Sequence, residues 1–77
     1  MRLIELADFL GEFNLEHPDY CLRGVVKSAS QISIDLDGLV IVKTTTLEKI
    51  EELGFARIRE RAETLIRHLD QHMAGGL

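Results

Sequence analysis

The chain has 77 residues, of which 45% are hydrophobic and 29% charged, and its formal net charge is −4. This balance is typical of a folded protein and excludes an intrinsically disordered one. The length suits a single small α+β domain over residues 1–77. The longest apolar run, residues 39–42, is far short of the roughly 20 residues that cross a bilayer, so we expect no membrane association.

The first predicted element is an amphipathic helix over residues 3–15. Apolar side chains recur at helical spacing on one face, with acidic side chains on the other. The apolar face is predicted to carry Leu3, Leu6, Ala7, Leu10 and Phe13. Pro18 disfavours the helical conformation for the residue before it, so the helix should end between residues 14 and 17.

Residues 20–43 predict a three-stranded antiparallel β-meander. Residues 32–36 alternate between apolar and polar, and residues 39–43 resume an apolar, β-branched run. The Asp37-Gly38 pair between these runs is typical of a two-residue type I′ turn, which needs positive φ at both positions. Residues 20–27 predict the first strand, whose register the sequence leaves open.

The predicted turn also indicates which side chains share a face of the sheet. It would place Leu36 opposite Leu39 and Ile34 opposite Ile41, all toward the core. The expected core face is Ile32, Ile34, Leu36, Leu39 and Ile41, joined from the first strand by Tyr20, Leu22, Gly24 and Val26. The expected outer face is Ser33, Asp35, Val40 and Val42, with Val40 and Val42 forming an outer sheet patch that a partner could cover.

From Thr45 the pattern becomes helical, with a break predicted near Gly54. Thr45 followed by Glu48 fits a capping box. The apolar stripe shifts around the helix after Gly54, which favours a glycine C-cap with Phe55 folding back on Ile50. A longer helix should then reach about residue 72, giving the order α-β-β-β-α-α.

An acidic stripe is predicted along the first helix, consisting of Glu5, Asp8, Glu12 and Glu16. Residues 1–38 carry three basic and seven acidic residues, whereas residues 39–77 carry six of each, so all the excess negative charge is in the first half. We interpret the stripe as a contact for a basic partner surface, including one that normally receives nucleic-acid phosphates. The alternative is a solvated face that only favours solubility.

A basic flank is predicted on the last helix, consisting of Arg57, Arg61, His68 and His72. These side chains could bind an anion or an acidic patch. The alternative is a boundary between core and solvent, where long side chains extend toward water. Because the chain has no overall basic excess, a protein is a more strongly indicated partner than a nucleic acid.

No residue pattern completes a catalytic, metal or cofactor site. His68 and His72 are four residues apart and could reach one metal ion, but two ligands do not make a site. His17 and Cys21 bring a base and a thiol close in sequence, although a cysteine entering a strand more often serves as a small buried hydrophobe. We therefore predict no enzyme activity, no cofactor and no metal.

Cysteine usage and size bear on compartment and assembly. Cys21 is the only cysteine, which fits a reducing environment, and the first residues lack the apolar region of a signal peptide. We expect a cytoplasmic protein. A chain this short buries only about 60% of its unfolded surface, so a homodimer is an alternative to a monomer.

The functional prediction is a small non-catalytic protein-binding module that acts by occupying a partner surface, in the manner of a phage-type inhibitor of a host or defence complex. The alternative is a dimeric nucleic-acid-binding regulator. That alternative would use the arginines of the last helix, namely Arg57, Arg59, Arg61 and Arg67, with Lys43.

Overall fold

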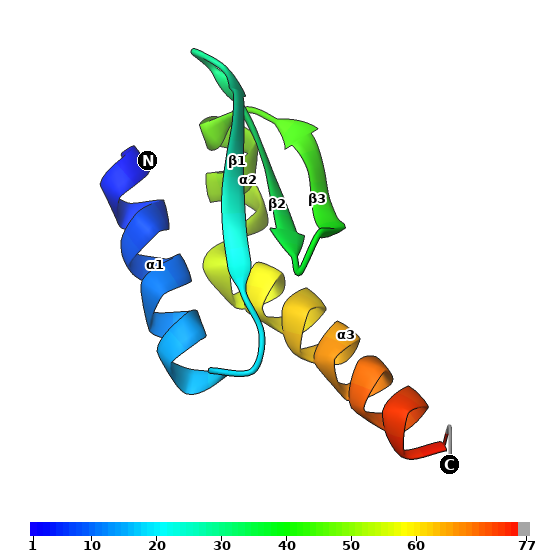
Figure 1. Cartoon of the computed structure of the whole chain (residues 1–77). Helices are drawn as coiled ribbons and strands as arrows, with labels where there is room; N and C mark the ends of the chain where they lie inside the picture. The colour runs from blue at the N-terminus through cyan, green and yellow to red at the C-terminus, as the bar shows by residue number, and fades with distance from the viewer. Residues whose placement is uncertain (76–77) are drawn as a thin grey trace.

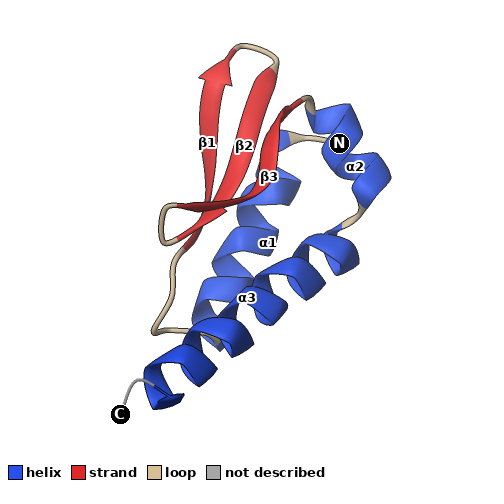
Figure 2. Cartoon of the chain, turned by 90° about the vertical axis from the view of Figure 1, so that its right-hand side faces the viewer, coloured by secondary structure: helices blue, strands red, loops and turns tan. Residues whose placement is uncertain are grey.

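The computed structural model describes residues 1–75, and side chains up to residue 72. Its elements are α1 (Leu3–Glu16), β1 (Leu22–Ser28), β2 (Gln31–Leu36), β3 (Leu39–Thr45), α2 (Leu47–Leu53) and α3 (Phe55–Gly75). The strands form one antiparallel sheet in the order β1-β2-β3, and the helices lie together on one side of it (Figures 1 and 2). The predicted α+β architecture and element order are confirmed.

The buried face of α1 differs from the predicted one. Leu6, Phe9 and Phe13 are buried, whereas Leu3 is 51% exposed and Ala7 is also exposed. Phe9 is buried because α3 packs beside α1, where the Phe9 ring stacks on Phe55 at the start of α3. The face toward the core therefore serves both the sheet and α3, not the sheet alone.

The end of α1 is fastened to the first strand by a side chain. The Asn14 amide donates to the Leu22 carbonyl at 3.0 Å, and the Leu22 N–H donates to Asn14 Oδ1 at 2.7 Å. This reciprocal pair fixes the direction in which the chain leaves the helix. The helix itself ends at Glu16, within the predicted range.

The Asp37-Gly38 turn has the predicted backbone conformation. The φ angle is 51° at Asp37 and 88° at Gly38, so both residues occupy the positive-φ region that a type I′ turn requires. The turn is also tied to β1. Asp37 N–H donates to the Cys21 carbonyl, and Asp37 Oδ1 accepts from the Cys21 N–H, both at 2.9 Å.

The predicted pairing between β2 and β3 is wrong beyond the turn. Observed partners are Leu36 with Leu39, Asp35 with Val40, Ile34 with Val42 and Ile32 with Thr45, with shifts in register between them. Strand β3 thus contains extra residues relative to β2, which is the definition of a β-bulge. Each extra residue turns the side chains that follow it in β3 to the opposite face of the sheet. Val42 is consequently a buried core residue at 6% exposure, whereas Val40 is 60% exposed.

Two residues predicted on the outer face of β2 are buried as well. Ser33 and Asp35 are 4% and 5% exposed. β2 is the central strand, so β1 and β3 flank it on both sides, and Arg23 of β1 covers the Asp35 carboxylate with two hydrogen bonds of 3.0 and 3.2 Å. Because Val42 lies in the core, the predicted two-residue outer patch of Val40 and Val42 does not form.

Of the residues on and before β1 that were expected to face the core, two are confirmed in that position. Leu22 is 1% exposed, and a side-chain carbon added to Gly24 would lie 3.0 Å from Ile32 Cδ1, so both positions face the core. Val26 is 62% exposed near the far end of the strand. Tyr20 precedes the strand and reaches α3 instead, where its hydroxyl donates to Asp70.

The helical segment is capped one residue later than predicted. Thr46, not Thr45, is the N-cap of α2 and accepts from the Lys49 N–H at 3.2 Å, because β3 continues through Thr45. The break at Gly54 is confirmed by its φ of 87° and by the bond from its N–H to the Ile50 carbonyl. The Phe55 ring stacks on Phe9, and its predicted contact with Ile50 stays a prediction.

One hydrophobic core joins all six elements. Its buried members are Leu6, Phe9, Phe13, Leu22, Ile32, Ile34, Leu36, Val42, Ile50, Ile58, Ala62 and Ile66. The last four of these lie on α2 and α3, and α3 continues past the predicted end to Gly75. Among the described residues, no helix is both long enough and apolar enough to traverse a bilayer.

Candidate protein-binding site

A groove lies between α1 and the first turns of α3, with a cavity volume of about 480 Å³. Its lining residues are Glu5, Asp8, Phe9, Glu12, Phe55, Ala56 and Arg59, and we name it the acidic groove. Three of the four residues of the predicted acidic stripe meet here. Phe9 and Phe55 add two parallel rings, with centroids 4.6 Å apart and an interplanar angle of 1°.

The carboxylates of this stripe differ in the partners they have. Glu16 lies outside the groove and pairs with Arg59 at 2.6 Å, while Glu5 makes a longer contact of 3.5 Å with Arg2. Among the side chains that the structure describes, those of residues 1–72, Asp8 and Glu12 have no ion-pair partner. Both are exposed, so they remain available to cations from outside the molecule.

Arg59 shows how a guanidinium fits against this surface. Its Cζ atom lies 5.8 Å from the Phe9 ring centroid and 5.6 Å from that of Phe13, within the range of cation–π contacts. Its Nη1 atom also reaches Glu16 at 2.6 Å and Glu63 at 3.9 Å. The combination of aromatic faces and carboxylates thus already holds one cation, at the end of the acidic groove.

Glu16, His17 and Glu63 form a small cluster beside Arg59. Their ligand-type atoms lie within 4.8 Å of one another, and His17 Nε2 is 3.4 Å from Glu63 Oε2. Such a set could be considered for a metal ion. The Arg59 guanidinium already occupies the cationic position beside both carboxylates, so we interpret the cluster as an ion-pair network that joins α1 to α3.

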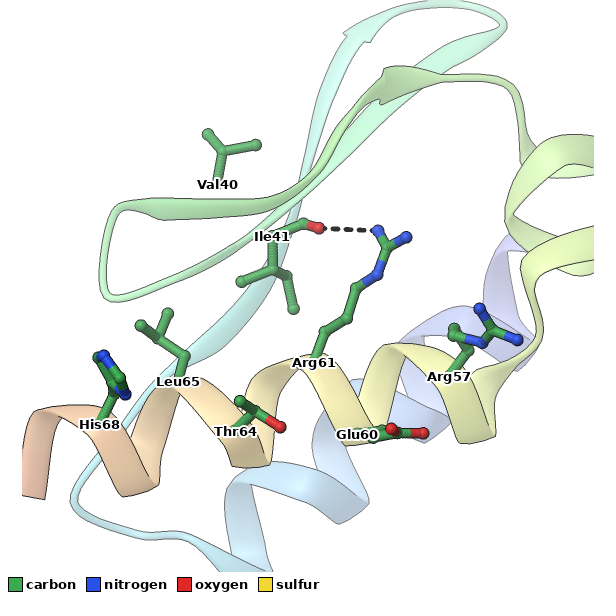
Figure 3. Close-up of a pocket in the computed structure, with 8 residues that line it drawn as sticks. All are labelled: Val40, Ile41, Arg57, Glu60, Arg61, Thr64, Leu65 and His68. Atoms are coloured by element: carbon green, nitrogen blue, oxygen red, sulfur yellow. Dashed lines mark hydrogen bonds between the residues drawn. The ribbon is translucent and has the colours of Figure 1, made fainter.

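A second groove lies between the β2–β3 hairpin and α3, with a cavity volume of about 490 Å³. Its lining residues are Val40, Ile41, Arg57, Glu60, Arg61, Thr64, Leu65 and His68, and we name it the hairpin groove (Figure 3). It brings together three residues of the predicted basic flank with apolar side chains. His72, the fourth, is exposed one turn farther along α3 and does not line it.

Arg61 bridges the two walls of the hairpin groove. Its Nη1 atom donates to the Ile41 carbonyl at 3.1 Å, which orients the guanidinium across the opening (Figure 3). Among the described residues, neither Arg57 nor Arg61 pairs with a carboxylate. A guanidinium has five N–H donors, so most of those on Arg61 stay free for an incoming anion.

Sequence reasoning missed two exposed apolar residues on α1. Ile4 is 61% and Leu15 is 84% exposed, on the side of the helix away from Leu6 and Phe13. Their exposure could have been predicted from helical spacing, since both residues fall outside the predicted apolar stripe of this helix. The hairpin groove was missed for another reason, because the closeness of Ile41 and Leu65 depends on how α3 crosses under β3.

Outside the grooves, one ion pair shifts the pKa of Asp35 and one hydrogen bond shifts the pKa of Tyr20. The Arg23 guanidinium beside Asp35 lowers the pKa of that carboxyl, although burial acts in the opposite direction. The hydrogen bond to Asp70 raises the pKa of Tyr20 to about 12, with smaller contributions from desolvation and nearby charges. The first pair joins β1 to β2, and the second joins the entry of β1 to α3.

Comparison with known protein families, with curated proteins and with solved structures found no match for this chain. Function is therefore inferred from the two grooves and the charges around them.

Proposed function

We propose that this protein is a small non-catalytic protein-binding module whose acidic groove receives a basic surface of a partner protein. One observation carries the proposal. The exposed carboxylates of Asp8 and Glu12, which have no ion-pair partner among the side chains of residues 1–72, border a groove that Phe9 and Phe55 also line. An acidic rim beside the partly exposed Phe55 ring suits the lysine and arginine side chains of a partner.

Three kinds of interaction would contribute to such binding: cation–π contact, charge attraction and burial of apolar surface. A cation over an aromatic face is stabilised by about 0.5–2 kcal/mol, depending on how far it is desolvated. Acidic charge concentrated on one helix also attracts a basic surface over distance and accelerates encounter. The exposed side chains of Ile4 and Leu15 on the same helix provide apolar area that a partner could bury.

Occupation of a basic surface has an inhibitory consequence. If the partner surface normally receives nucleic-acid phosphates, the acidic groove competes with the nucleic acid for the same cations. A phage-type inhibitor of a host or defence complex would act in this way, without chemistry of its own.

The test is affinity capture with charge-reversed variants. The tagged protein is used to capture partners from lysate of its own host, with and without nuclease, and bound proteins are identified by mass spectrometry. Replacement of Glu5, Asp8 and Glu12 together by lysine should remove the partner.

The matched control reverses the same amount of charge elsewhere. Asp19, Glu48 and Glu52 are exposed and lie outside both grooves, so their replacement by lysine should leave capture intact. Equal capture by both triple variants would contradict the proposal. Loss of all partners after nuclease treatment would instead favour the nucleic-acid alternative and the arginines of α3.

A further inference from the structure

The acidic groove and the hairpin groove lie on different flanks of the molecule. α1 packs beside β1, one edge of the sheet, whereas the hairpin groove lies beneath β3, the other edge (Figures 1 and 3). Among the described side chains, the carboxylates of Asp8 and Glu12 on one flank have no ion-pair partner, and neither do the two guanidinium groups that lie beside Glu60 on the other. Two copies of the chain can therefore present opposite charges to each other.

The exposed side of α1 carries a row of residues four positions apart, which we name the acidic ridge. It consists of Ile4, Asp8 and Glu12, all exposed. Residues at this spacing form a continuous ridge on a helix surface, with a rise of about 6 Å between neighbours. The order along the chain is one apolar residue followed by two acidic ones.

The wall of the hairpin groove on α3 carries a row at the same spacing, which we name the basic ridge. It consists of Arg57, Arg61 and Leu65. Its order is two basic residues followed by an apolar one, and Leu65 faces Ile41 across the groove (Figure 3).

The two ridges are complementary when they run in opposite directions. Glu12 then meets Arg57, Asp8 meets Arg61, and Ile4 meets Leu65 beside Ile41. Ridges of this four-residue spacing pack side by side in the commonest class of helix contact in globular proteins. Two charge pairs and one apolar contact thus coincide in a single alignment.

We infer that a second copy of this chain docks its acidic ridge on the basic ridge, so that copies associate head to tail. The contact joins two different surfaces, so one copy of the pair keeps a free basic ridge and the other keeps a free acidic ridge. Such contacts produce closed rings or open chains, not isolated twofold dimers. The inference extends the proposed function, because the acidic ridge shares Asp8 and Glu12 with the acidic groove, and self-association would compete with the partner.

The test is sedimentation velocity of the pure protein, with reductant present because Cys21 is exposed. Over a concentration series up to about 1 mM, where even weak association is visible, the wild type should form species larger than a dimer at low salt. About 0.5 M salt should return it to monomer, since exposed charges are then strongly screened. A wild type that stays monomeric throughout overturns the inference.

Charge reversal tests the alignment. The variant Asp8→Arg with Glu12→Arg, and separately Arg57→Glu with Arg61→Glu, should each be monomeric. All four substitutions in one chain exchange the sign of both ridges, so self-association should return. Circular dichroism verifies that each variant is folded.

Mixing the two double variants gives a sharper result. The first then carries basic side chains on both ridges and the second carries acidic side chains on both, so the mixture should form alternating species larger than a dimer, although each variant alone is monomeric. Controls that reverse Glu48 with Glu52, or Lys27 with Arg67, should associate like the wild type. No association in the mixture, or equal disruption by the controls, would overturn the inference.

The outcome is separable from that of the proposed function. Partner capture uses dilute lysate and a foreign protein, whereas sedimentation uses the pure chain alone. A monomeric wild type that still loses its partner on reversal of Glu5, Asp8 and Glu12 would remove the self-association and leave the binding module in place.

Discussion

Phe9 of α1 and Phe55 of α3 stack with parallel rings, their centroids 4.6 Å apart. Phe9 is almost fully buried, and the pair is where α3 leaves the break at Gly54 and meets α1. The stack therefore determines how the two helices border the acidic groove. Replacing either ring changes both stability and the shape of the candidate site.

We predict that Phe9 and Phe55 are energetically coupled. Each single change to leucine should destabilise the fold by about 1 kcal/mol, since volume is roughly kept. The double variant should reveal a coupling of about 0.5–1.5 kcal/mol from the lost aromatic pair. Urea unfolding of the four proteins measures it. Leu15→Ala, at a position 84% exposed, is the control and should change stability by less than about 0.5 kcal/mol. Strictly additive effects would contradict the prediction.

Elements with strong local signals could be predicted from the sequence. The Asp37-Gly38 turn and the break at Gly54 both depend on positive φ, which glycine tolerates and which the flanking patterns indicate. Register in β3 could not be predicted. The run Leu39 to Val42 is apolar at every position, so a bulge leaves no trace in its pattern.

The candidate site was predictable only in part. The acidic stripe and the basic flank follow from helical spacing within one helix, which sequence gives directly. Their neighbours across each groove depend on tertiary packing. Nothing local indicates that Phe55 stacks on Phe9, or that Ile41 lies over Leu65.

The register shifts in β3 lead to a prediction about Val40 and Val42, which lie two positions apart. Val42→Thr should destabilise the protein by about 1–3 kcal/mol, because it places a hydroxyl in the core, where Val42 is 6% exposed. Val40→Thr, at 60% exposure, should change stability by less than about 0.5 kcal/mol. Urea unfolding compares the two. Similar costs at both positions would contradict the observed register.

The Arg23–Asp35 pair leads to a prediction about pH. Asp35 has a pKa lowered from its ordinary value of 3.8, so the stability it contributes is present above that value and is lost as pH falls through the lower, folded-state pKa. Arg23→Gln leaves a buried carboxylate without its partner. It should cost about 1–3 kcal/mol at neutral pH, toward the lower end because Arg23 is largely exposed.

The deficit of Arg23→Gln should shrink on acidification, because protonation removes the buried charge in the variant before it does so in the wild type. Urea unfolding at several pH values between about 3 and 7 measures this trend. Arg2→Gln, in an exposed pair, is the control and should show little deficit at any pH. A deficit for Arg23→Gln that is independent of pH would rule out the charge interaction as its cause.

Tyr20 provides a direct test of how the entry of β1 is joined to α3. It is the only tyrosine and the chain has no tryptophan, so phenolate absorbance reports this residue alone. The hydrogen bond to Asp70 raises the pKa of Tyr20 from 10.0 to about 12. The stabilisation is therefore complete below the unfolded value and is lost as pH rises through the folded one.

We predict that Asp70→Asn lowers the pKa of Tyr20 toward its ordinary value, because the carboxylate that accepts the hydrogen bond from the phenol is gone. Asp19→Asn is the control. Asp19 raises the pKa of Tyr20 only through charge at a distance, and by less than Asp70, so its removal should cause a much smaller decrease. An absorbance titration of the folded protein, with circular dichroism at each pH, measures both. A Tyr20 pKa that is unchanged in Asp70→Asn would show that α3 is not held to the entry of β1 by this bond.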